Sequence, residues 1–153
     1  MFEGNKFNIA VRFICSVLIV VTFVYVFAAW HDLPDRIPIH FDAAGEPNGY
    51  GSKYTMIIFP LIMLGMFIMM EVVARHPKSW NTGVKVTERN QEKVYKIIRN
   101  MLSYVELAIT VLFTVISFMM AGVGSLGKAF LPVTLIAILG GTAVWLVKLF
   151  RVK

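Results

Sequence analysis

The stretch HDLPDRIPIHFDAAGEPNGYGSK, residues 31–53, separates two long apolar segments. It contains two histidines, three aspartates and a glutamate, and it is far less basic than the later polar connection. Proline fixes φ and glycine permits turns, so three of each in one stretch predict a shaped, ordered loop rather than a plain linker. The prolines are Pro34, Pro38 and Pro47, and the glycines are Gly45, Gly49 and Gly51.

The composition around this loop indicates an integral membrane protein. Of the 153 residues, 58% are hydrophobic and 16% are charged, whereas soluble domains are about one quarter charged. A core of this size cannot bury such an apolar excess, so much of it must face lipid. We therefore expect an all-α membrane domain over residues 1–153, with four transmembrane helices at about 11–30, 54–73, 101–123 and 130–149.

The basic residues predict an orientation. Twelve of the 15 lie near the chain ends or in the connection 74–100, and three, at Arg36, Lys53 and Lys128, lie elsewhere. The positive-inside rule places both termini and the 74–100 connection in the cytoplasm and the 31–53 loop outside. The net charge of +6 thus indicates membrane topology rather than nucleic-acid binding. Anionic lipid or a cytoplasmic regulator is the expected partner of residues 75–99.

The end of the basic connection has apolar residues at helical spacing. They predict an amphipathic helix at the cytoplasmic surface that leads into the third span. The residues are Val94, Ile97, Ile98, Met101, Leu102 and Val105.

The third span carries a polar stripe. Its members are three, four, four and three positions apart, so they share one helical face that should point into the bundle. One interpretation is hydrogen bonding between helices, with Glu106 wetted or paired with a base such as Arg99. The other is a proton or ligand site. The stripe consists of Ser103, Glu106, Thr110, Thr114 and Ser117.

The loop also holds potential metal ligands. Ile37, Ile39 and Phe41 alternate with polar neighbours, which predicts a short extended piece with one face on the bundle and with His40 and Asp42 pointing together. No spacing is diagnostic of a metal, so no cofactor is expected beyond a possible divalent cation. Its candidate ligands are His31, Asp35, His40, Asp42 and Glu46.

The sequence LPDRIPIHFDAAGEPNGYGSK, residues 33–53, resembles the signature of the bacterial domain-of-unknown-function 1648 family, which is related to SdpI-like immunity membrane proteins. Residues 79–102 also resemble the family's cytoplasmic segment. The resemblance implies a bacterial cytoplasmic membrane and a possible role in toxin immunity or signal reception. The residues on the signature are Leu33, Pro34, Ile37, Pro38, His40, Phe41, Gly45 and Lys53.

Three functions follow as hypotheses. The first is an SdpI-like membrane binding protein whose external loop captures an extracellular peptide or toxin. The second is a small homo-oligomeric transporter or channel component that uses the stripe of the third helix. The third, for which the sequence shows no activated nucleophile, is a metal-dependent membrane enzyme. Candidate ligand-binding residues are Pro34, Asp35, Pro38, His40, Asp42, Gly45, Lys53 and Glu106.

Overall fold

Four long apolar helices form the described part of the chain, residues 4–122 and 124–152 of a computed structural model. The first three are α1 (Lys6–Ala29), α2 (Thr55–Ala74) and α3 (Gln91–Met120). The last consists of α4 (Phe130–Leu135), the π-helical turn η2 (Ile136–Gly140) and α5 (Gly141–Phe150). Each is long and apolar enough to cross a membrane, so the expected number of long apolar helices is confirmed within the described residues. Val123, the expected end of the third span, lies outside the described residues.

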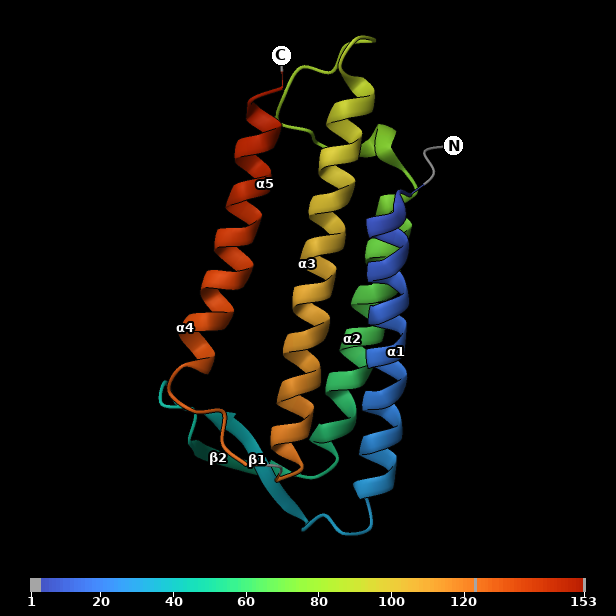
Figure 1. The fold of residues 1–153 in the computed structure, drawn as a ribbon. Helices are drawn as coiled ribbons and strands as arrows, with labels where there is room; N and C mark the ends of the chain where they lie inside the picture. Colours follow the sequence, from blue (N-terminus) through green and yellow to red (C-terminus); the bar gives the residue numbers. More distant parts are fainter. Residues whose placement is uncertain (1–3, 123, 153) are drawn as a thin grey trace.

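The helices alternate in direction around α3, which lies against α1, α2 and α5 (Figure 1). One end of the bundle, here called the basic end, carries both termini and the connection between α2 and α3 (Figure 1). That connection contains a short 3-10 turn, η1 (Pro77–Ser79). The opposite end, called the hairpin end, carries the connections from α1 to α2 and from α3 to α4.

The amphipathic segment and the third span are a single helix. α3 runs from Gln91 to Met120, and Val94 and Ile98 in its first turns are buried. These two residues pack against Leu149 near the end of α5. Their apolar face is therefore covered by protein, not by lipid as a helix lying at the membrane surface would require.

The expected all-α fold is incomplete, because the loop between α1 and α2 contains a β-hairpin. Strands β1 (Arg36–Phe41) and β2 (Pro47–Ser52) pair antiparallel. Below them, Leu33 and Ile37 are buried. These two side chains form one apolar cluster with Val26 of α1, Met56 of α2 and Met120 of α3. The hairpin thus covers the end of the bundle (Figure 1).

The extended piece is confirmed, but its alternation is not. The strand register is irregular on both sides of His40. As a result Ile37 is 1% exposed, whereas Ile39 is 38% exposed. β2 has the sequence PNGYGS, and its proline, asparagine and glycines are all rare in strands. The second strand of the hairpin could therefore not be predicted from residue propensities.

The last helix is fixed to the bundle near its π-helical turn. The Tyr104 hydroxyl of α3 donates a hydrogen bond to the carbonyl oxygen of Ala137. Gly141 lies directly against the Tyr104 ring, so that a methyl group at this position would overlap the phenol. The adjacent Gly140 would meet only Ile136 of its own helix, at 4.0 Å.

We expect Gly141→Ala to lower the thermal stability of the protein in detergent. The added methyl must push α5 away from Tyr104, and overpacking of this kind costs about 1–3 kcal/mol. Gly140→Ala is the matched control, because it makes the same change in open space and should leave the melting temperature unchanged or slightly higher. Equal melting temperatures for the two variants would contradict the close approach.

A buried polar seam between three helices

The polar stripe of α3 faces the interior, as its spacing predicted. All five members are buried, with exposures between 0% at Ser117 and 8% at Ser103. Together with side chains from α1 and α2 they form a row of polar groups between the three helices. We define the polar seam as Asn8, Arg12, Thr22, Glu71, Ser103, Glu106, Thr110, Thr114 and Ser117.

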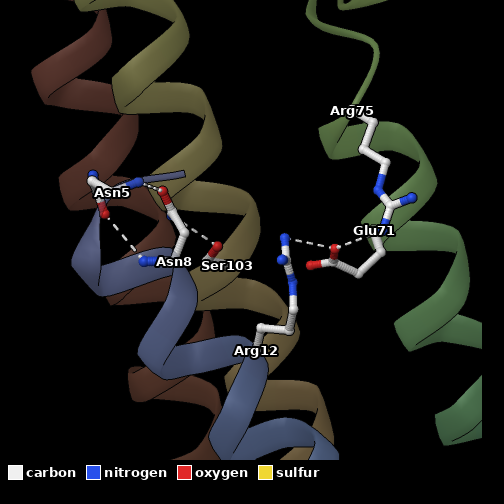
Figure 2. A network of polar contacts seen from close by, with 6 residues as sticks. All are labelled: Asn5, Asn8, Arg12, Glu71, Arg75 and Ser103. Atoms are coloured by element: carbon white, nitrogen blue, oxygen red, sulfur yellow. Dashed lines mark hydrogen bonds and ion pairs between the residues drawn. The ribbon is translucent and has the colours of Figure 1, made fainter. Parts of the chain in front are cut away.

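At the basic end the seam begins with asparagines. Asn5 caps α1 and forms a reciprocal capping box with Asn8. The Asn8 amide nitrogen, which is buried, donates to Ser103 Oγ at 3.0 Å and to Asn100 Oδ1 at 3.0 Å. Figure 2 shows Asn8 pointing from α1 toward Ser103. The sequence analysis missed this contact, although the Asn-x-x-Asn spacing before an apolar run is itself a helix-start signal.

Next along the seam, α1 and α2 share an ion pair. Arg12 Nη2 lies 2.8 Å from Glu71 Oε2, and Arg75 Nη2 lies 3.9 Å from the same oxygen (Figure 2). The Glu71 side chain is only 14% exposed, whereas that of Arg75 is 69% exposed. Glu71 was also missed, although an acid inside an otherwise apolar span marks a position that must face protein.

Glu106 lies one turn beyond Ser103 and has no such pair. It is 5% exposed, and its Oε1 has no hydrogen-bond partner within residues 4–122 and 124–152. The charges that act on it most strongly are those of Glu71 and Arg12. Arg99, the base suggested by the sequence, is not among them. Glu106 is therefore a buried acid beside an ion pair in which it does not take part.

Beyond Glu106 the seam contains hydroxyl groups. Thr110 Oγ1 donates to the Glu106 carbonyl at 2.8 Å, and Thr114 Oγ1 donates to the Thr110 carbonyl at 2.9 Å. Thr22 of α1 crosses to Thr114 at 3.2 Å. Further toward the hairpin end, the apolar cluster under the hairpin begins at Met120. The seam is thus polar from the basic end to mid-bundle and closed by apolar side chains beyond.

The candidate loop residues mostly hold the hairpin together. Asp42 Oδ1 accepts from the backbone nitrogens of Ala44 at 2.8 Å and Glu46 at 3.0 Å, so it caps the turn between the strands. His40 Nδ1 contacts Asn48 Oδ1 across the hairpin. His40 and Asp42 therefore serve separate local contacts and do not point together as expected.

Lys53 and Gly45 anchor the two ends of the hairpin. Lys53 Nζ lies 3.2 Å from Asp35 and 5.8 Å from the centre of the Trp30 ring. The Gly45 carbonyl accepts from Leu126 in the α3–α4 connection at 3.1 Å. Gly45 has φ +79°, and a Cβ there would lie 2.5 Å from the Gly127 nitrogen, so both backbone conformation and space favour glycine.

The described residues of the loop do not form a metal-binding arrangement. Nowhere in the described part of the chain do three His, Cys, Asp or Glu side chains lie close enough to hold an ion. His31 and Pro34 are exposed in the turn between α1 and β1, and Pro38 is half-buried opposite Tyr50. The five candidate ligands are near one another in the sequence, but the hairpin and its flanking turns do not bring three of these side chains together.

Four helices are long and apolar enough to cross a membrane, and three of them enclose the buried polar seam, which indicates a multi-pass membrane protein. The family model of DUF1648, a domain of unknown function, matches residues 17–64. The chain therefore contains a DUF1648 domain that spans the second half of α1, the hairpin and the first half of α2. No curated protein and no solved structure shows a significant match.

We expect the Arg12–Glu71 contact to show positive coupling in a double-mutant cycle with Arg12→Gln and Glu71→Gln. Each single change leaves the other charge without this ion pair, most unfavourably the largely buried Glu71, whereas the double variant leaves neither charge. Thermal unfolding in detergent should give a coupling energy of about 1 kcal/mol, because Arg12 remains partly exposed. Strict additivity of the two single changes would mean that the pair contributes nothing to stability.

Proposed function

We propose that the protein is a membrane transport component that moves protons along the polar seam, with Glu106 as the exchanging group. The observation that carries this proposal is the buried Glu106 carboxyl, whose Oε1 lacks a partner in the described residues. Ionisable side chains inside a membrane bundle are costly, and they commonly mark ion or proton pathways. A carboxyl that is already hydrogen-bonded and ion-paired would have no such task.

The neighbours of Glu106 support an exchange of protons. Arg12 forms an ion pair with Glu71. Its positive charge also acts on Glu106, which it does not contact directly. Glu106 therefore has a neighbouring charge of each sign and takes part in no ion pair of the described residues that a proton transfer would have to break.

The rest of the seam supplies polar groups on both sides of Glu106. Asn8 and Ser103 lie toward the basic end, and the hydroxyls of Thr110, Thr114 and Thr22 lie toward the hairpin. The apolar cluster beneath the hairpin blocks the far end, so the hairpin acts as the gate of this pathway. The seam lies within one chain, so a second copy is not needed to form it.

The proposed orientation follows the charge distribution. The end of the bundle that carries the termini and the α2–α3 connection holds most of the basic residues, and by the positive-inside rule this supports a cytoplasmic location for that end in the proposed bacterial membrane. The hairpin then faces the outside of the cytoplasmic membrane. Protons would reach Glu106 from the cytoplasmic side and leave past the hairpin.

We expect Glu106→Gln to reduce proton flux to the level of empty liposomes, because glutamine keeps the size of the side chain but cannot exchange a proton. Purified protein is reconstituted with an internal pH-sensitive dye, a pH gradient is imposed, and its decay is followed. Glu88→Gln, the same change at an exposed position before α3, is the matched control and should decay like wild type. Wild-type decay in the Glu106 variant would refute the proposal.

A second candidate is the hairpin as a peptide receptor, in toxin immunity or signal reception of the SdpI-like kind. β1 and β2 pair only with each other in the described residues, so each leaves one strand edge open. Open edges accept an extended peptide by backbone hydrogen bonding. Ile39 and Tyr50 on the hairpin are 38% and 54% exposed and offer apolar contact beside those edges.

If the hairpin binds a peptide toxin, Tyr50→Ala should abolish protection of a sensitive bacterial strain challenged with secreted antimicrobial peptides. The variant removes exposed ring area and leaves the buried side of the hairpin intact. Tyr50→Phe keeps the ring and should protect like wild type. Glu106→Gln should also protect, which separates this function from proton transport. Survival of the Tyr50→Ala strain at matched membrane expression would exclude the hairpin face.

A further inference from the structure

Three buried polar atoms in the charged part of the polar seam have no hydrogen-bond partner within residues 4–122 and 124–152. They are Arg12 Nε, Glu71 Oε2 and Glu106 Oε1. Arg12 Nη2 lies 2.8 Å from Glu71 Oε2, but this contact is an ion pair and not a well-directed hydrogen bond. Leaving a buried donor or acceptor without a hydrogen bond is costly, so such atoms indicate a further partner.

Ser103 supplies a fourth group, because the direction of its contact with Asn8 is determined. Asn8 Oδ1 already accepts from the backbone nitrogen of Asn5 at 3.0 Å, so the Asn8 amide nitrogen faces Ser103. Ser103 Oγ is therefore the acceptor in this bond, and its own hydroxyl hydrogen is left to donate. The other three hydroxyls of the α3 stripe donate to the backbone carbonyl four positions earlier, but in the described part of the chain Ser103 does not.

The four groups lie at one level of the bundle. α1 and α3 both begin at the basic end, so they run in the same direction (Figure 1). Two hydrogen bonds between them join residues that are 95 and 92 positions apart, so their register is nearly constant along the seam. At this register Arg12 faces Glu106, which follows Ser103 by about one helical turn. Glu71 reaches the same level through its ion pair with Arg12 (Figure 2).

These groups match the bonding capacity of a water molecule. Arg12 Nε and the Ser103 hydroxyl are donors, whereas Glu71 Oε2 and Glu106 Oε1 are acceptors. Water has two hydrogens and two lone pairs, and a buried water commonly makes about three hydrogen bonds to groups that lack other partners. A metal cation fits less well, because the two donors would point their hydrogens at it.

We propose that the polar seam binds one ordered water molecule between Arg12, Glu71, Ser103 and Glu106. The water joins the three helices at the place where charged side chains are buried. It also gives Glu106 a partner for proton exchange: a hydronium ion at this position passes one proton to the Glu106 carboxylate and remains as water. The role of the water in transport rests on the proposed function, whereas its presence in the seam does not.

The first test is a crystal structure of the full-length protein at a resolution that shows ordered water. A single density peak should lie about 2.6–3.2 Å from all four atoms. Ser117→Ala should keep the peak, because the Ser117 hydroxyl already donates to the Phe113 carbonyl at 2.8 Å. A direct Ser103–Glu106 hydrogen bond without the peak would overturn the proposal. An anomalous signal at this position after soaking with Tl⁺ would also overturn it, in favour of a monovalent cation.

The second test is proton flux in the liposome assay. Ser103→Ala removes one of the donors to the water and should slow the flux about fivefold, which is the effect of one neutral hydrogen bond. Ser103→Thr keeps the hydroxyl and should restore the wild-type rate, which a purely structural role of the small side chain would not predict. Equal rates in the alanine variant and wild type would refute the role of the water in transport. Wild-type flux in Glu106→Gln would refute the transport function itself, while the density peak would still decide whether the water is bound.

Discussion

The polar face of α3 is the constraint on which the rest of the bundle depends. Five polar side chains along one stripe of a membrane helix cannot remain in hydrocarbon without cost, so neighbouring helices must cover them. α1 does so with Asn8 and Thr22, each of which contacts a stripe residue directly. α2 contributes Met63, whose sulfur meets Thr114 at 3.8 Å. The apolar rims of all three helices are then left for lipid.

Much of this arrangement was predictable from the sequence, because it follows from periodicity. Apolar runs of about 20 residues indicated the four helices, and the spacing from Ser103 to Ser117 indicated the interior face of α3. The hairpin was only half visible. The alternation of apolar and polar residues indicated an extended segment at β1, but β2 consists of residues that are rare in strands. β2 is stabilised by its pairing with β1 and by the contacts of Lys53 and Gly45, not by its intrinsic strand propensity.

The candidate functional residues could be predicted only where they form a periodic polar pattern along a single helix. Glu106 belongs to a stripe and could be found. Glu71 and Arg12 are single charges on different helices, and their contact across 59 positions depends on how α1 and α2 pack. In the 31–53 loop the error was the reverse, because residues that are close in the sequence were expected to form one metal site. Its acids and histidines are close in sequence, but Asp35, His40 and Asp42 each contact a different nearby group instead of one another.

The matched domain and the ionisable residues of the polar seam occupy different parts of the chain. Residues 17–64 contain the hairpin and the adjoining halves of α1 and α2. The ionisable seam residues Arg12, Glu71 and Glu106 all lie outside that range. The DUF1648 domain thus supplies the cap and its scaffold, whereas the charged centre depends on the start of α1, the end of α2 and all of α3.

The cap under which Met120 packs also has a consequence for biogenesis. The hairpin is synthesised after α1, yet its underside is completed by Met120, and its tip is held by Leu126. Leu33 and Ile37 therefore lack part of their cover until α3 has been made and inserted. The apolar cluster beneath the hairpin is therefore complete only after the third helix has been synthesised.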